Sequence, residues 1–258
     1  MDLDSQNSHS FKKFVISTEI YHERLNYFFS HNDSVSEAEV IMGINAQKLQ
    51  NDHAGLAELR KQTSENSMWP LGSICCGLAH YEVFRKCIET NVPMTIFEDD
   101  AILVSDFEMK SKRLIERAGT DWDIIQWGFN WDSFLDIRIP QKIGPVFRLS
   151  LKSELEKFKI EEFKKSGINS SLFPLVSSFG MHGYTISPTG ARKFLDHYPK
   201  IVDIFINNLD LLGHSYWALS LDMVLNSFYN TNNCFIALPP LSFVENDKNK
   251  SAIWHSNT

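Results

Sequence analysis

Apolar and polar positions alternate along the first half of the chain with two different periods. Four short apolar runs have the length and composition of buried strands, at 14–17, 40–42, 94–97 and 122–127. Three longer segments carry apolar residues three and four positions apart, as amphipathic helices do, at 19–29, 71–88 and 107–118. Strands that alternate with helices in this order predict an α/β fold with a mostly parallel sheet flanked by helices.

The second half of the chain has a less regular pattern. Residues 129–177 show only a short strand at 146–149 and a charged surface helix over 152–165, so this region is interpreted as an irregular insert. After it, the pattern again predicts strands and helices, with strands at 179–187 and 235–240 and helices at 188–196 and from 222 onward. Residues 1–10 are polar and are predicted to be a flexible N-terminus.

Three consecutive carboxylates follow the apolar run that starts at Met94. Glu98, Asp99 and Asp100 cannot share the core with that run, because each unpaired buried charge costs several kcal/mol. They are therefore expected where the strand leaves the sheet, and in open α/β sheets ligands bind in the crevice at the carboxyl ends of the strands. Adjacent carboxylates repel one another and attract a hard divalent cation. A solvated acidic turn is the alternative interpretation.

Composition narrows the class of protein. The chain has 258 residues, 43% of them hydrophobic, and a formal net charge of −7, which argues against nucleic acid as the main partner. The cysteines have no C-x-x-C spacing and are interpreted as free thiols in a reducing compartment, with zinc binding as the alternative: Cys75, Cys76, Cys87 and Cys234. With no apolar run long enough to span a membrane and no secretory leader, the sequence predicts a cytoplasmic location.

Several blocks, in order along the chain, resemble glycosyltransferase family 25, which contains bacterial lipooligosaccharide β-galactosyltransferases and animal collagen galactosyltransferases. The first blocks are Val15-Ile16-Ser17 with Arg24, then the Gly72–Phe84 segment with its Cys-Cys-Gly-Leu-Ala-His core, then Glu98-Asp99-Asp100-Ala101. The later ones are Gly180–Ser187, Gly190–Leu195, Asp222-Met223, Leu238–Leu241 and Ser251–Ile253. At Asp222 the family has a preceding Pro that this chain lacks, and residues 129–177 match no block.

The resemblance implies a GT-A-type, Rossmann-like fold in a single domain over 11–258, with a nucleotide-binding half at 14–127 and an acceptor-binding half at 128–258. It also implies an inverting transferase that moves a hexose, in most members galactose from UDP-galactose, onto a glycan or glycolipid acceptor. Lipooligosaccharide or lipopolysaccharide core is the favoured acceptor, which implies peripheral contact with the inner face of the cytoplasmic membrane. A divalent metal, Mn²⁺ or else Mg²⁺, is the expected cofactor.

The residues expected to act divide into three roles. Asp100, with Asp99, is assigned to the metal, and His255 is a further candidate ligand. The donor-binding set is Ile16, Ser17, Arg24, His80, Glu98, Asp99, His182 and Tyr184. Inversion needs a base that removes the proton of the acceptor hydroxyl, and Asp222 is chosen for it, with Asp210 and Glu245 as reserve candidates.

Each of these assignments has a structural alternative. Asp222 can instead cap a helix, Arg24 can pair with Glu23, and His80 and Tyr184 can be ordinary core residues. For the whole protein, the rival interpretation is a catalytically inactive nucleotide-sugar or glycan-binding protein of the same fold. A phosphotransferase with an acidic metal site is a third possibility, weakened by the absence of a glycine-rich phosphate loop.

Overall fold

A computed structural model describes residues 11–64, 66–139, 144–207 and 215–244. In this part of the chain one sheet has nine strands. Their bounds are β1 (Lys12–Ser17), β2 (Glu39–Met42), β3 (Met94–Glu98), β5 (Ile124–Gln126), β6 (Leu135–Arg138), β7 (Val146–Leu149), β8 (Ser171–Ser178), β9 (Gly183–Ile186) and β12 (Cys234–Leu238). Two smaller two-stranded sheets pair β10 (Phe205–Ile206) with β11 (Tyr216–Trp217), and β13 (Ser242–Phe243) with β4 (Ile102–Leu103).

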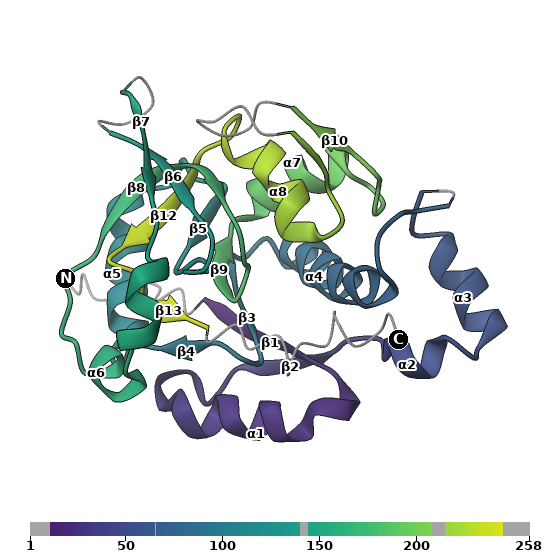
Figure 1. The fold of residues 1–258 in the computed structure, drawn as a ribbon, viewed down its shortest axis with the longest axis horizontal. Coiled ribbons are helices and arrows are strands. Elements are labelled where there is room, and N and C mark those ends of the chain that lie inside the picture. The colour runs from purple at the N-terminus through teal and green to yellow at the C-terminus, as the bar shows by residue number, and fades with distance from the viewer. Residues whose placement is uncertain (1–10, 65, 140–143, 208–214, 245–258) are drawn as a thin grey trace, which may run out of the picture.

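Helices surround the sheet (Figure 1). The α-helices are α1 (His22–His31), α2 (Ala46–Leu49), α3 (His53–Arg60), α4 (Leu71–Thr90), α5 (Phe107–Ala118), α6 (Ile160–Lys164), α7 (Pro188–His197) and α8 (Leu221–Tyr229). Short 3-10 helices lie at η1 (Glu19–Tyr21), η2 (Asp33–Val35) and η4 (Lys152–Lys157). The predicted α/β class is confirmed. The stretch 152–165, predicted as one helix, is instead divided between η4 and α6.

The sheet is mixed, with the strand order β2-β1-β3-β9-β5-β12-β8-β6-β7. The pairs β1–β2, β1–β3 and β5–β12 are parallel, as the βα alternation predicted. However, β9 runs antiparallel between β3 and β5, and β8, β6 and β7 extend the sheet through antiparallel pairs. The insert at 129–177 thus supplies three strands of the sheet, because an antiparallel neighbour needs no helical crossover and leaves no βα pattern in the sequence.

Both faces of the central strands are buried, and each face has its own core. Successive side chains of a strand point to opposite faces. On one face, Phe14 and Ile96 pack in the cluster that contains the buried side of α4. On the other face, Val15 and Phe97 pack in the cluster that contains Phe28 of α1 and residues of α5. The prediction of a strand at 94–97 buried on both faces is confirmed, and its acidic end must therefore emerge at the sheet edge.

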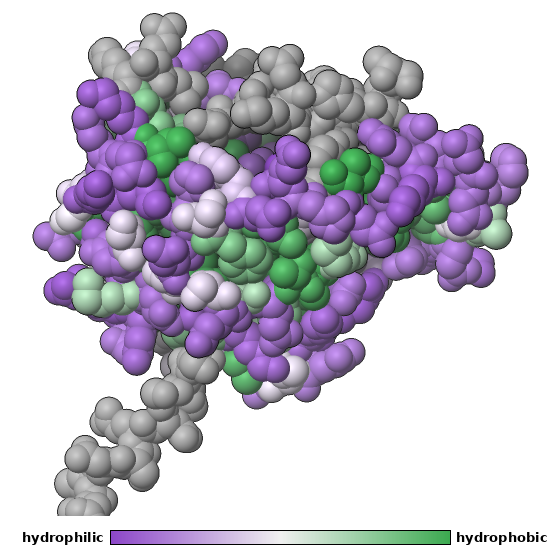
Figure 2. All heavy atoms as spheres, turned by 90° about the horizontal axis from the view of Figure 1, so that it is seen from below, coloured by the Kyte–Doolittle hydropathy of each residue, from purple (hydrophilic) through white to green (hydrophobic). Residues whose placement is uncertain are grey.

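The surface seen from below is mostly hydrophilic, with hydrophobic side chains gathered toward the middle of that face (Figure 2). On β2, which is an edge strand of the large sheet, Val40 is 37% exposed and Met42 is 45% exposed. In the described ranges, no helix combines the length and the apolar character needed to cross a bilayer.

Candidate functional site

Three segments from different parts of the chain meet at the same edge of the sheet. β1 and β3 are parallel and Ile16 is paired with Glu98, so Ser17 and the acidic residues both follow the carboxyl ends of neighbouring strands. β9 is antiparallel to β3, so its first residues lie at that same edge. The backbone N–H of Glu98 donates to the carbonyl oxygen of His182, 3.2 Å away. The three acids therefore lie at the carboxyl ends of the strands, as predicted.

Arg24 of α1 neutralises part of the acidic cluster. Its Nη2 lies 2.6 Å from Oδ1 of Asp99 and 2.7 Å from Oδ2 of Asp100. The hydroxyl of Ser17 donates to Oδ2 of Asp99 at 2.6 Å. Oδ1 of Asp100 is buried and has no hydrogen-bond partner among the described residues. The structure thus assigns Arg24 an ion pair with two of the three acids, rather than leaving it at the helix surface.

Burial and neighbouring charges shift the pKa values of the three carboxyl groups in different directions. Burial raises the pKa of Asp99, and it raises the pKa of Asp100 to about 7, in both cases against the opposing effect of Arg24. Burial also acts to raise the pKa of Glu98, but His80 and Arg24 hold that pKa below its usual value. These environments therefore favour the ionised form of Glu98 and disfavour the ionised forms of Asp99 and Asp100.

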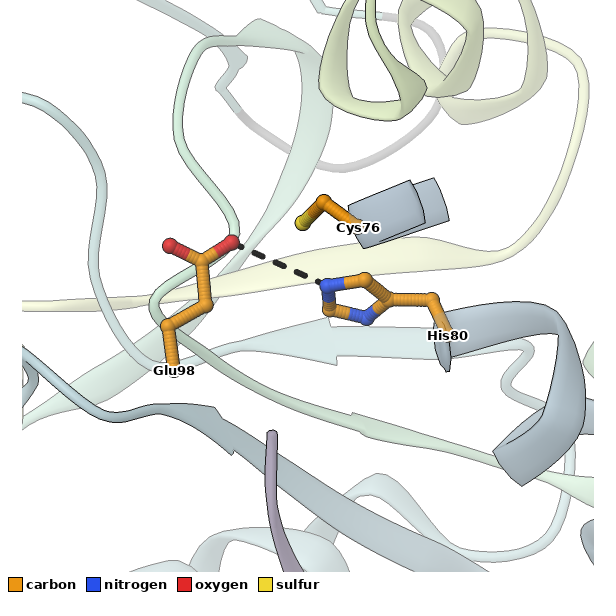
Figure 3. Close-up of side chains that lie close together, drawn as sticks. All are labelled: Cys76, His80 and Glu98. Atoms are coloured by element: carbon orange, nitrogen blue, oxygen red, sulfur yellow. Dashed lines mark ion pairs between the residues drawn. The ribbon is translucent and has the colours of Figure 1, made fainter. Parts of the chain in front are cut away.

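Two buried histidines face the acidic cluster. His80 projects from α4, with Nδ1 2.7 Å from the hydroxyl of Tyr184 and Nε2 3.7 Å from Oε1 of Glu98 (Figure 3). His182 is 1% exposed, and neither of its ring nitrogens has a hydrogen-bond partner in the described part of the chain. Burial lowers the pKa of His182 to about 4, so its ring is neutral at physiological pH.

Asp222 lies in the first turn of α8, which follows Ser220. Its Oδ1 accepts hydrogen bonds from the Ser220 hydroxyl and from the backbone N–H of Met223, and its Oδ2 accepts one from the N–H of Gly180 at 3.0 Å. Ser220, not Asp222, occupies the N-cap position. Gly180 has a φ of +88°, a conformation that glycine adopts without strain.

The pKa of the Cys76 thiol responds to Asp222 as well as to the acidic cluster. Burial raises its pKa well above the usual value, and the charges of Glu98, Asp222 and both aspartates of the cluster raise it further. Carboxylates from both halves of the chain therefore act electrostatically on one side chain.

This chain matches the family model described as glycosyltransferase family 25 (LPS biosynthesis protein) over residues 10–211. It belongs to glycosyltransferase family 25. The resemblance inferred from the sequence blocks is thereby confirmed, and the protein is a glycosyltransferase by family. A comparison with curated protein sequences found no match.

Among solved structures, the chain is similar to the apo form of mouse xyloside xylosyltransferase 1. The similarity covers 84% of this chain and 81% of that one, with 9% sequence identity and a TM-score of 0.33. At that TM-score the likeness carries no argument about fold or activity. The family assignment rests on the sequence match.

The residues expected from the family blocks have distinct environments. Ser17, Arg24, Glu98, Asp99 and Asp100 come together, and so do His80 and Tyr184. Ile16 is 6% exposed and packs in the core beside Glu98, and Tyr184 is 1% exposed. Asp210, Glu245 and His255 lie outside the described residues.

Two contributors to the site were not assigned to it from the sequence, in which Cys76 was interpreted as a free thiol with zinc binding as the alternative. Cys76 lies one helical turn before His80, and an i, i+4 pair of potential ligands on one helix face is a signal that the sequence already contains. Gly128 was not singled out either. A Cβ there would lie 2.1 Å from the carbonyl oxygen of Ser242 and 2.6 Å from Nε2 of His182, so only glycine lets these two segments approach.

Proposed function

We propose that this protein is an inverting, metal-dependent hexosyltransferase that moves galactose from UDP-galactose onto a glycan acceptor of the lipopolysaccharide core. The observation that carries the proposal is the meeting of Glu98, Asp99 and Asp100 with Arg24 at one edge of the sheet, in a chain of family 25. The description of the family, LPS biosynthesis protein, supports the choice of acceptor.

The acidic residues fit a hard divalent cation. The carboxyl groups of Asp99 and Asp100 pair with one arginine, and Oδ1 of Asp100 is buried without a hydrogen-bond partner in the described ranges. Oxygen ligands of this kind suit Mn²⁺ or Mg²⁺. Asp100 and Asp99 would hold the ion, which when bound supplies positive charge against the diphosphate of the leaving nucleotide.

The chain's own residues supply the remaining steps of the proposed reaction. The guanidinium of Arg24 adds a fixed positive charge where the diphosphate would lie, and its pairing with Asp99 keeps it in position. Asp222 receives the proton of the acceptor hydroxyl at Oδ2, because among the described residues that oxygen accepts only the Gly180 bond and keeps a lone pair. The buried, neutral ring of His182 helps to exclude water from the same edge.

A donor screen tests the proposal. Chelator-treated protein is supplied with Mn²⁺, Mg²⁺ or neither, and with UDP-galactose, UDP-glucose or UDP-N-acetylhexosamines, and transfer to lipopolysaccharide core oligosaccharide is measured. We expect transfer from UDP-galactose only with metal, and a kcat about 10²- to 10³-fold lower in Asp100→Asn. The matched control is Glu58→Gln on α3, because Glu58 forms a solvent-exposed pair with Lys61. This variant should keep wild-type kcat. Metal-independent transfer would contradict the proposal.

A binding protein without turnover is the second candidate, and the contacts of Asp222 favour it. Oδ1 of Asp222 accepts a hydrogen bond from the start of α8, and Oδ2 accepts one from Gly180 between β8 and β9. A purely structural carboxylate would make the same contacts. If Asp222 is the base, Asp222→Asn lowers kcat about 10²- to 10⁴-fold while donor affinity is kept. Donor binding with no product from any acceptor would instead identify the binding protein.

A further inference from the structure

Three side chains of different chemical type point toward one another beside the acidic cluster. Figure 3 shows Cys76 and His80 projecting from α4 toward Glu98 at the end of β3. One ligand atom from each of the three lies within 4.8 Å of the other two. Cys76 and His80 are four residues apart on one helix, so they share a face of it.

The spacing of these atoms fits a tetrahedral ion. Two ligands that bind one Zn²⁺ at about 2.0–2.2 Å are separated by about 3.3–3.6 Å at the tetrahedral angle. Nε2 of His80 and Oε1 of Glu98 are 3.7 Å apart, longer than a hydrogen bond but close to that separation. The sulfur of Cys76 lies within 4.8 Å of both of these atoms.

His80 has the environment of a metal-ligating histidine. Its side chain is 1% exposed, and its Nε2 is buried with no hydrogen-bond partner among the described residues. The other ring nitrogen, Nδ1, is 2.7 Å from the Tyr184 hydroxyl, which fixes the orientation of the ring. An imidazole that uses one nitrogen for an orienting hydrogen bond and presents the other, unpaired, to a carboxylate and a thiol is the usual arrangement around a transition metal.

We propose that Cys76, His80 and Glu98 form a binding site for a thiophilic divalent ion such as Zn²⁺, separate from the oxygen ligands of Asp99 and Asp100. A thiolate with an imidazole selects Zn²⁺ over Mg²⁺ and Mn²⁺, which prefer oxygen. Three protein ligands leave a fourth position for water or a substrate atom. When the ion binds, the sulfur–hydrogen bond of Cys76 is replaced by a sulfur–metal bond and one proton passes to solvent.

The test measures binding directly and needs neither donor nor acceptor, so it does not depend on the proposed transferase reaction. Untagged, chelator-treated protein is dialysed against Zn²⁺ in the presence of excess Mg²⁺, and the bound metal is quantified. In parallel, Co²⁺ is added and the near-ultraviolet absorption of a thiolate–cobalt bond is recorded. We expect one tightly bound ion per chain and an absorption band of the intensity given by a single thiolate.

Matched variants locate the ion. Cys76→Ser should remove the cobalt band and weaken Zn²⁺ binding by more than about 100-fold, because loss of a ligand exceeds the 10- to 100-fold effect of losing an outer partner. Cys75→Ser, which removes the neighbouring buried thiol, should keep both signals. Tyr184→Phe, which removes the hydrogen bond to His80, should weaken Zn²⁺ binding by about 10- to 100-fold. Thermal unfolding checks that each variant folds. If a variant does not fold, Glu98→Gln, which changes another of the three proposed ligands, is measured in its place.

Three outcomes would overturn the inference. The first is no stoichiometric Zn²⁺ or cobalt band in the wild type. The second is a band that survives Cys76→Ser. The third is loss of Zn²⁺ binding in Asp100→Asn with retention in Cys76→Ser, since that would place the ion on the aspartates. Failure of the transferase assay alone leaves these measurements unaffected.

Discussion

Removing the charge of Arg24 is expected to destabilise the protein more than a surface charge would. The change Arg24→Met keeps much of the aliphatic stem but removes the cation that contacts Asp99 and Asp100. The side chain of Asp99 is 7% exposed, and leaving one member of a buried pair uncompensated costs about 3–5 kcal/mol. The side chain of Asp100 is 39% exposed, so solvent screens its pair with Arg24 and that pair adds less, about 0.2–1 kcal/mol.

The net loss should be smaller than the sum of these figures. Ser17 still donates to Asp99 in the variant, and either carboxyl can take up a proton instead of remaining an unpaired charge. We therefore expect the free energy of unfolding at pH 7.5, measured by urea titration in the presence of chelator, to fall by about 2–3 kcal/mol. For a chain of this size that corresponds to a decrease in Tm on the order of 5–10 °C.

The loss of unfolding free energy in Arg24→Met should depend on pH in a definite direction. Arg24 acts to lower the pKa of both aspartates, so its removal raises folded-state pKa values that burial already raises. A carboxyl with a folded pKa above its unfolded value costs stability above the unfolded pKa, and that cost disappears as the pH falls through the folded pKa. The deficit of Arg24→Met relative to wild type should thus shrink between pH 8 and pH 5.

Lys13→Met is the matched control, since Lys13 pairs with an exposed glutamate, Glu108, and should change stability by less than about 0.5–1 kcal/mol. Two results would refute the reasoning. One is an Arg24→Met variant as stable as the Lys13 control. The other is a deficit that grows on acidification.

Two further predictions concern the surroundings of the site. Gly128→Ala places a Cβ against the backbone of Ser242 and the ring of His182, so the free energy of unfolding should fall by about 1–3 kcal/mol. Gly43→Ala, where the nearest atom to the added carbon lies 3.4 Å away, is the control without such crowding. Burial raises the pKa of Cys75 to about 11 and of Cys87 to about 12, so iodoacetamide at pH 7.5 should leave both unmodified in native protein and alkylate them after unfolding, as read by mass spectrometry of peptides.

A Gly128→Ala variant as stable as wild type would show that the close approach of these segments is not required. Rapid alkylation of Cys87 in folded protein would show that the β3–α4 side of the core opens readily. Alkylation confined to the unfolded protein agrees with the packing described above.

Local patterns made part of the fold and of the site predictable. The strand at 94–97 and the helix that begins at 71 depend on apolar runs and spacings a few residues long, and both are confirmed. The position of Glu98, Asp99 and Asp100 at the sheet edge followed from the cost of burying charge. Family 25 membership was predictable because its sequence blocks occur in order along the chain.

Long-range pairing was not predictable from the sequence. The partners of Arg24 lie more than seventy residues away, and nothing near Arg24 in the sequence indicates them. β8 contains Pro174, which argues against a strand. The hydroxyl of its buried Ser177 donates a hydrogen bond to Asp136 of β6. Asp136 is itself buried because Arg148 of β7 binds both of its oxygens at 2.8 Å. From the sequence alone, each of these polar residues would be predicted to be exposed, because its partner lies on another strand.

The position of β9 constrains how the chain can acquire its structure during synthesis. β3 and β5 are each hydrogen-bonded to β9 and lie on opposite sides of it, so the centre of the large sheet stays open until Ile186 has left the ribosome. At typical rates of translation this interval lasts several seconds after β5 has been made, with two apolar strand edges unpaired. A nascent chain stalled between 127 and 182 should therefore be a chaperone client, whereas one released after β12 should not.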